Sequence, residues 1–158
     1  MADLRGLVEE LGGEDARTYV QSGNVVFRSR RAPAKLEDAL AKAIRRSLGL
    51  EITVLVRTAA QLAKIVAGNP FLASGADPLK LHATLLKSAP DRVHVHRLSA
   101  GDFAPDELRV AGDAVYLHCP NGYGRSKLSN AFFEKQLGVP ATTRNWKTVT
   151  ALAELAGG

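Results

Sequence analysis

The strongest constraint on the fold of this chain is that one order of predicted elements occurs in it twice. In each half, a helix is followed by a hairpin, a second helix and a strand. The second half has an additional strand in front of this series, at Leu81–Leu86. A chain of 158 residues fits one domain or two small fused subdomains. The repeat favours two related halves that mix helices with strands.

The elements of the first half are predicted from helical spacing, β-rich composition and turn residues. Apolar residues from Leu4 to Leu11 recur at helical spacing. Gly23 and Asn24 can take the positive φ that a hairpin turn needs. The remaining elements are a hairpin of Arg17–Gln21 and Val25–Arg28, a helix from Pro33 to Gly49, a strand at Ile52–Val56 and a helix from Thr58 to about Val66.

The second half follows residues 71–79, which have no periodicity and contain turn-forming residues, and which we predict to be a linker. Residues 92–99 suit a strand, because valine and histidine alternate there, or a short helix. The remaining elements are a strand at Leu81–Leu86, a hairpin of Glu107–Val110 and Ala114–Cys119, a helix of about Ser126–Leu137, a strand at Ala141–Arg144 and a last short helix from Thr148 or Thr150.

Both halves follow the order of the ferredoxin-like unit, β-α-β-β-α-β, although the first half lacks its opening strand. We therefore predict an α+β fold of two ferredoxin-like subdomains. The first spans residues 1–70, the linker spans residues 71–79 and the second spans residues 80–158.

Four long segments carry a family resemblance: LRGLVEELG at 4–12, RTYVQSGNVVF at 17–27, VLVRTAAQL at 54–62 and GYGRSKLSNAFFEKQLGVPATTRNWKTV at 122–149. Together they resemble the family called domain of unknown function 1697, and the resemblance covers nearly the whole chain. It implies an α+β fold of two ferredoxin-like halves. It implies no catalytic residues, because the activity of the family is not settled.

Members of this family have an upstream strand and a glycine-bearing loop, similar to LLRGIN, before the helix that here starts at Met1. In a ferredoxin-like sheet that strand lies between the third and fourth strands of its unit. Its absence leaves the edges of Val25–Arg28 and Ile52–Val56 unpaired, and unpaired edges favour association. We expect direct pairing of these two strands, a strand donated by another chain as in a homodimer, or marginal stability. A start codon further upstream in the gene is the simplest explanation.

The net charge of +5 is concentrated in one stretch, Cys119–Thr150. Five basic residues stand there against Glu134 alone, so this stretch carries +4 and the other 126 residues carry +1. A local basic surface suggests an anionic partner, although such a run is about as often only a solvated face.

A glycine-rich turn in this stretch leads into the predicted helix at Ser126. The free N–H groups at a helix start attract anions, and the helix dipole disfavours cations such as Arg125 and Lys127 there unless an anion binds. The alternative is that Ser126 is an ordinary N-cap and both basic side chains are solvated. The turn matches neither a P-loop nor GxGxxG.

The returning segment adds groups that could bind phosphate or stack on a base. Trp146 is the only tryptophan, and a lone tryptophan is more often a core residue than a stacking platform. The predicted ligand-binding residues are Gly122, Tyr123, Gly124, Arg125, Ser126, Lys127, Arg144, Asn145, Trp146 and Lys147.

A second polar set lies at the tip of the first hairpin. Turn chemistry accounts for Gly23 and Asn24, but it does not account for Gln21 and Ser22. We predict Gln21, Ser22 and Asn24 as a secondary site.

The cysteine and the histidines predict no metal, cofactor or catalytic dyad. Cys119 is the only cysteine, so it forms no internal disulfide and is predicted to be a buried structural thiol. His94 and His96 share a face only on a strand, with no carboxylate or thiol nearby. His118 points away from Cys119 because neighbours on a strand face opposite ways.

No apolar run approaches the ~20 residues of a membrane span. The first residues predict an amphipathic helix rather than a secretory signal. Together with the single cysteine, this favours a cytoplasmic protein without a membrane partner.

These features lead to one main hypothesis and two alternatives. The main one is a binding module for a phosphate-bearing ligand, either a nucleic acid or a phosphorylated small molecule such as a nucleotide. The first alternative is an enzyme that acts on such a substrate, although no base is recognisable. The second is a protein-interaction module that uses its sheet edges.

Overall fold

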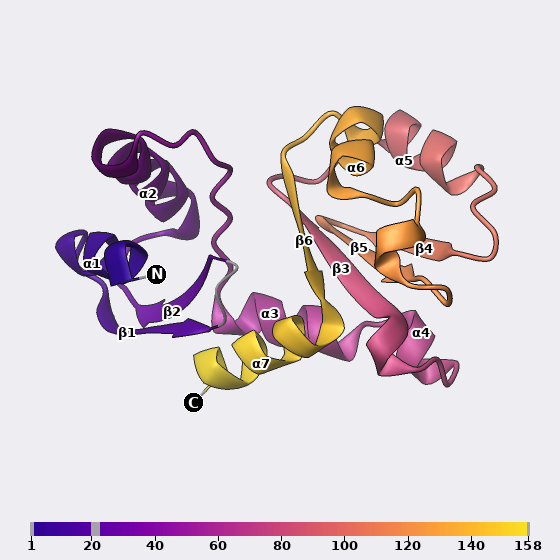
Figure 1. Cartoon of the computed structure of the whole chain (residues 1–158), viewed down its shortest axis with the longest axis horizontal. Helices are drawn as coiled ribbons and strands as arrows, with labels where there is room; N and C mark the ends of the chain where they lie inside the picture. The colour runs from indigo at the N-terminus through magenta and orange to yellow at the C-terminus, as the bar shows by residue number, and fades with distance from the viewer. Residues whose placement is uncertain (1, 20–22, 158) are drawn as a thin grey trace. The chain divides into compact units, whose positions relative to one another are not determined.

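The structure, a computed structural model, describes residues 2–19 and 23–157 (Figure 1). The chain forms two compact units, one of residues 1–63 and 151–158 and the other of residues 64–150. Among the described residues, the sheet of the first unit has two strands and that of the second has four. The fold is α+β, as predicted.

The first unit packs two helices against a hairpin. Leu7 and Val8 of the first helix and Leu40 and Ile44 of the second are buried, together with Ala16 of the hairpin. The hairpin and both helices were predicted and are confirmed. The elements are α1 (Ala2–Glu10), the antiparallel strands β1 (Glu14–Tyr19) and β2 (Asn24–Arg28), α2 (Pro33–Leu48) and the start of α3 (Ala59–Ala67).

The helix predicted from Thr58 is confirmed as α3, and Thr58 caps its start. The Gln61 N–H donates to the Thr58 hydroxyl oxygen at 3.1 Å, and the Thr58 N–H donates to the Gln61 side-chain oxygen at 2.8 Å. This reciprocal pair is a capping box, which satisfies two N–H groups that the first turn of a helix leaves open.

The predicted strand at Ile52–Val56 is wrong. Residues 49–58 form no strand and connect α2 to α3 (Figure 1). A segment with strand-like side chains becomes a strand only when a neighbouring backbone pairs with it. Direct pairing with β2, one of the three expected outcomes, does not occur among the described residues.

The second unit is built on a four-stranded antiparallel sheet of order β4-β5-β3-β6. Because β5 lies between β3 and β4, the connection through α5 crosses over one strand, as in a ferredoxin-like unit. The elements are α4 (Pro70–Ala73), η1 (Pro78–Lys80), β3 (Leu81–Leu86), α5 (Arg92–Ser99), β4 (Glu107–Ala111), β5 (Ala114–His118), η2 (Tyr123–Arg125), α6 (Asn130–Leu137), β6 (Ala141–Asn145) and α7 (Trp146–Gly157).

The two faces of this sheet are covered by different helices. Val115 and Leu117 of β5 pack with the buried residues of α5 and α6, which lie on the same side of the sheet (Figure 1). Ala114 and Tyr116 pack on the other face, against residues of α3, α4 and α7. Successive strand residues therefore serve separate cores, as the period of two requires.

The structure decides between strand and helix for residues 92–99, and it shows which residues of α6 are buried. Residues 92–99 form a helix, which starts where the Asp91 carboxylate accepts the Val93 N–H at 2.8 Å. In α6, Phe133 is fully buried, whereas Ala131 is exposed.

The segment predicted as a linker, residues 71–79, contains most of α4 and the start of η1. Its Phe71 is buried in the same cluster as Trp146. Asn69 caps α4 by accepting the Phe71 N–H at 2.9 Å.

Candidate functional site

One end of the second sheet carries most of the predicted ligand-binding residues. β3 and β4 begin at this end and β5 and β6 end there, since Leu81 pairs with His118 and His82 pairs with Asn145. The loop of residues 119–129, between β5 and α6, starts at the same end. The fold thus brings the glycine-rich turn and the end of β6 to one edge of the sheet.

The loop of residues 119–129 is fixed at its two ends. Cys119 and Leu128 are fully buried, and the Cys119 N–H donates to the Lys80 carbonyl at 2.9 Å. Between these anchors, Gly122 has a φ of +97°, which a residue with a Cβ rarely adopts. The single turn of η2 follows it.

The predicted helix start at Ser126 is wrong. α6 begins at Asn130, and its N-cap is Ser129, whose hydroxyl oxygen accepts the Phe132 N–H at 3.2 Å. Arg125 and Lys127 therefore precede the helix instead of lying in its first turn. The argument from the helix dipole does not apply to them, because the field of the dipole falls off within one turn.

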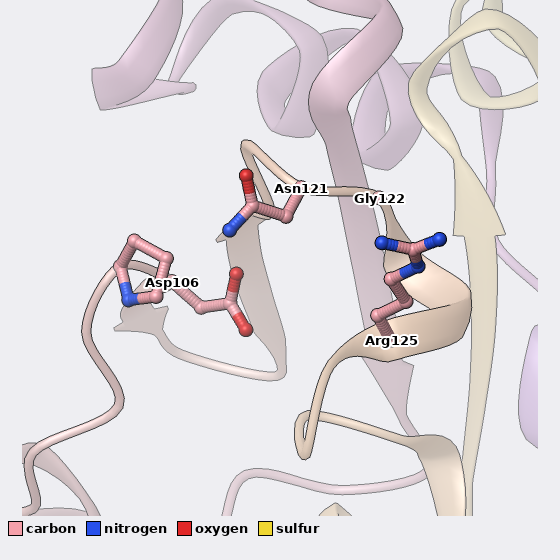
Figure 2. A pocket seen from close by; sticks show the side chains of 5 residues that line it. Asp106, Asn121, Gly122 and Arg125 are labelled. Carbon is pink, nitrogen blue, oxygen red and sulfur yellow. The ribbon is translucent and has the colours of Figure 1, made fainter.

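A pocket of about 260 Å³ opens beside η2 (Figure 2). Its lining is Pro105, Asp106, Asn121, Gly122 and Arg125. Of these five residues, only Gly122 and Arg125 were predicted as site residues. Asn121 adjoins the predicted turn, so its polar side chain was a usable signal. Pro105 and Asp106 lie directly before β4, and no local pattern connects them with the turn.

Asp106 is tied to the loop through Ser126. The Ser126 hydroxyl donates to one Asp106 carboxylate oxygen at 2.7 Å and accepts the Leu128 N–H at 3.0 Å. The second carboxylate oxygen has no hydrogen bond within the described part of the chain, and Asp106 lines the pocket. The pocket therefore contains an anionic acceptor as well as a cationic donor.

The two basic residues of the turn are exposed. Over residues 2–19 and 23–157, neither Arg125 nor Lys127 makes a hydrogen bond or an ion pair. Arg125 and Asp106 line the same pocket without pairing with each other (Figure 2). All donors of the Arg125 guanidinium are thus open to a ligand.

The Tyr123 ring contacts another side chain of the protein. Its ring stacks on that of His82, with centroids 4.5 Å apart and an angle of 22° between the planes. Burial lowers the pKa of His82, so the imidazole beneath the tyrosine is neutral near pH 7. One face of Tyr123 is therefore not available for stacking on a base.

Arg144 does not join the turn. It pairs with Ala83, whereas His82, on which Tyr123 stacks, points to the opposite face of the sheet. Its guanidinium donates to the Thr143 carbonyl at 3.0 Å, and burial lowers its pKa. Arg144 therefore lies on the face of the sheet opposite to His82 and the Tyr123 ring stacked on it.

The three residues after Arg144 have different environments. Asn145 is exposed and caps α7, where its side-chain oxygen accepts the Thr148 N–H at 2.8 Å. Trp146 is only 3% exposed and packs near Tyr116, with ring centroids 6.3 Å apart. Lys147 is exposed. Of the predicted stacking residues, Trp146 belongs to the core.

The secondary site at the first hairpin falls mainly outside the described residues, which omit Gln21 and Ser22. Asn24 is described and is 6% exposed. Its side-chain N–H donates to the Tyr19 carbonyl at 3.2 Å, so this amide stabilises the hairpin.

Cys119 and the histidines form no metal cluster. Over residues 2–19 and 23–157, no three His, Cys, Asp or Glu side chains group together as metal ligands. Burial raises the pKa of the Cys119 thiol; the Ser126 hydroxyl opposes the rise and the Asp106 carboxylate adds to it. A thiol in these surroundings is a poor nucleophile.

Comparisons with known proteins place this chain in a family. The sequence profile of a protein family of unknown function, DUF1697, matches residues 1–116. The chain belongs to the DUF1697 family. The match ends before the loop of residues 119–129, so it includes Asp106 but not Asn121, Gly122 or Arg125. None of the curated proteins matches the chain.

A solved structure has the same fold as this DUF1697 member. It is that of the conserved bacterial protein SP0830 from Streptococcus pneumoniae, which is 18% identical in sequence and superposes with a TM-score of 0.76. The superposition covers 100% of this chain and 89% of SP0830. At this identity the likeness supports the fold and says nothing of a ligand.

A helix that crosses a membrane needs about 20 mostly apolar residues. In the part of the chain that the structure describes, no helix has both the length and the apolar character for it.

Proposed function

We propose that the protein binds a phosphate-bearing ligand, a nucleotide or a nucleic acid, in the pocket beside η2. The observation that carries the proposal is the state of Arg125. Its guanidinium lines the pocket and has no protein partner among the described residues, although a carboxylate lines the same pocket. An arginine of this kind can make a bidentate, charge-assisted contact with a phosphate. Lys127 adds a second exposed cation two residues away.

Asp106 favours a ligand that carries hydroxyl groups as well as phosphate. A lone phosphate would be repelled by the Asp106 carboxylate, whereas a ribose hydroxyl could donate to its second oxygen. A nucleotide offers both groups. The cytoplasmic location expected from the sequence would give the protein access to such ligands.

The test is binding of a labelled single-stranded RNA of about 12 nucleotides, measured by fluorescence anisotropy. We expect Arg125→Ala to weaken binding about tenfold, since it removes a charge-assisted contact. Arg97→Ala, which changes an exposed arginine of α5, is the matched control and should change the affinity less than twofold. Equal effects of the two variants would contradict the proposal.

The dependence of the binding constant on salt concentration is a second test. Arg125 and Lys127 account for two phosphate contacts, and Lys147 could supply a third. With about 0.7 counterions released per contact, the slope of log K against log salt should lie between about −1.4 and −2. An affinity that does not change with salt would show that no phosphate is contacted.

A second candidate is an enzyme that acts on a phosphorylated substrate. The observation that favours it is the bond of 2.7 Å from the Ser126 hydroxyl to the Asp106 carboxylate, which places a base beside a hydroxyl nucleophile. Incubation with nucleotides should then release phosphate, and Asp106→Asn should abolish the release while binding persists. Binding without turnover by the wild-type protein would leave only the binding function.

A further inference from the structure

We propose that the first unit binds the phosphate backbone of a nucleic-acid duplex through a basic face on and next to α2. This surface lies in the first unit and the pocket beside η2 lies in the second, so the inference is independent of the proposed function. It assigns a macromolecular partner to the unit that the proposed function does not use. The basic face consists of five exposed cations, Arg30, Arg31, Lys35, Lys42 and Arg46.

Residues 28–46 carry a charge of +5, which equals the net charge of the whole chain. Seven basic residues stand there against Glu37 and Asp38. Acidic residues of α1 and β1 offset this excess in the total charge of the first unit, so the net charge does not reveal it. A local excess of this kind attracts a polyanion even when the rest of the protein is neutral.

The cations of the basic face are not neutralised by the protein. Over residues 2–19 and 23–157, the side chains of the five residues make neither a hydrogen bond nor an ion pair. The two other basic residues of this stretch are paired with exposed acids, Arg28 with Asp15 and Arg45 with Glu51. The unpaired cations are therefore all members of the basic face.

Three of these cations, Lys35, Lys42 and Arg46, are aligned along one side of α2. With 3.6 residues per turn, they lie within about 40° of one another around the helix axis and span roughly 16 Å along it. The opposite side of α2 packs against α1 and the hairpin through Leu40 and Ile44 (Figure 1). The aligned cations therefore face away from the core of the unit.

The free protein contains a repulsion that a bound polyanion would relieve. Lys42 and Arg46 are one helical turn apart, and like charges at this spacing destabilise a helix. Asp38 is the only exposed acid of α2 and precedes Lys42 by one turn. In the part of the chain that the structure describes, these two residues form no ion pair. A phosphate between Lys42 and Arg46 would replace this repulsion with two attractions.

The absence of aromatic residues favours a duplex over a single strand. Surfaces that bind single strands stack bases on aromatic side chains, and residues 28–48 contain no aromatic residue. A duplex instead presents about one phosphate per 1.7 Å of its axis, or about nine over the roughly 16 Å of the aligned cations. Contacts from exposed lysine and arginine side chains to these phosphates require no access to the bases.

The buried apolar side of α2 favours a nucleic acid over a membrane. A helix that lies on a lipid surface inserts its apolar side between the headgroups. In α2 this side is already packed in the core of the first unit. Phosphates on the outside of a duplex can be contacted without any such insertion.

The test measures binding of labelled duplexes of about 24 base pairs, one of DNA and one of RNA, to the full chain by fluorescence anisotropy. We expect at least one duplex to bind, with a slope of log K against log salt of about −4.5, because five contacts release about 0.9 counterions each. Two unrelated sequences of that duplex should bind within about twofold of each other. Failure of both duplexes to bind at about 50 mM salt, or a strong sequence preference, would overturn the proposal.

The variant Lys35→Gln/Lys42→Gln/Arg46→Gln removes three of the five cations. Each lost contact should make the salt slope about 0.9 less steep and the affinity at least about threefold weaker, so the triple variant should bind at least about thirtyfold more weakly. It should fold, because all three side chains are exposed. Its urea midpoint should not fall, since the repulsion between Lys42 and Arg46 is removed. Unchanged duplex affinity would overturn the proposal.

The matched control is Lys87→Gln/Arg92→Gln/Arg97→Gln, which removes the same charge from exposed residues of the second unit. It should weaken duplex binding less than about threefold, because only the general attraction of the protein is reduced. Equal losses in the two triple variants would overturn the proposal in favour of an effect of net charge. Arg125→Ala should leave duplex binding unchanged, and loss of binding in this variant would overturn the proposal in favour of the pocket beside η2.

Vesicles distinguish a nucleic acid from a lipid surface as the partner. Phosphatidylcholine vesicles with about 30% phosphatidylserine should not sediment the wild-type protein. Sedimentation that the Lys35→Gln/Lys42→Gln/Arg46→Gln variant loses, without binding of either duplex, would overturn the proposal in favour of an anionic membrane.

Discussion

Removal of the Glu37 carboxylate should destabilise the first unit more than any surface change does. Glu37 and Arg57 form an ion pair of 3.9 Å, with side chains only 9% and 7% exposed. The same carboxylate accepts the Val56 N–H at 2.9 Å. Glu37→Ala would remove one partner of the buried Arg57 guanidinium and the acceptor of the part-buried Val56 N–H.

The size of the effect follows from these two losses. Breaking a buried ion pair costs about 3–5 kcal/mol, and we expect the lower end because 3.9 Å is long for such a pair. With a urea m-value of about 2 kcal/mol/M, a loss of about 3 kcal/mol moves the unfolding midpoint by about 1.5 M. Glu37→Gln keeps an acceptor for the Val56 N–H and should lie between wild type and Glu37→Ala.

Urea unfolding followed by far-UV circular dichroism measures the midpoint, and hydrogen exchange at Val56 measures the local effect. The matched control is Glu51→Ala, which removes a glutamate paired with Arg45 at 3.5 Å where both side chains are more than 70% exposed. Its cost should be below about 0.5 kcal/mol. Equal midpoint shifts for the two variants, or unchanged exchange at Val56, would refute the reasoning.

Two further predictions concern titratable side chains in the second unit. Because burial lowers the pKa of His82 below its usual 6.5, the unfolded chain binds a proton that the folded chain does not, and stability falls as the pH drops through 6.5. His82→Gln should reduce the difference between urea midpoints at about pH 7.5 and about pH 5.5, and an unchanged difference would exclude this role. Cys119 is fully buried and its pKa is raised, so at about pH 8 DTNB should label it at least about a hundredfold more slowly in native protein than in urea. Rapid labelling of the native protein would contradict this burial.

Local sequence signals predicted the elements whose residue pattern agrees with their place in the fold. Leu81–Leu86 was predicted as a strand and forms β3, where alternate side chains enter two cores. The helix predicted from Thr58 forms as α3, and its start is stabilised locally, because Thr58 and Gln61 bond to each other within one helical turn. By contrast, Ile52–Val56 has strand-like residues but pairs with no other backbone among the described residues, and local sequence does not contain that information.

At the candidate site, too, local sequence could not predict contacts between residues that are distant in the chain. Ser126 and Ser129 are both good helix caps by type, and the fold selects Ser129 because the Ser126 hydroxyl is taken by Asp106 and by the Leu128 N–H. Asp106 and Asn121 line one pocket although they are far apart in the chain. Only the sheet, with β4 beside β5, brings them together.

The way the loop of residues 119–129 is anchored has a consequence for how such a protein can evolve. Its contacts with the rest of the protein are made by Cys119, Tyr123, Ser126 and Leu128, whereas Asn121, Arg125 and Lys127 are exposed. Substitutions at exposed positions change stability by only about 0.5 kcal/mol. The residues that line this pocket can therefore change by mutation without passing through an unstable protein.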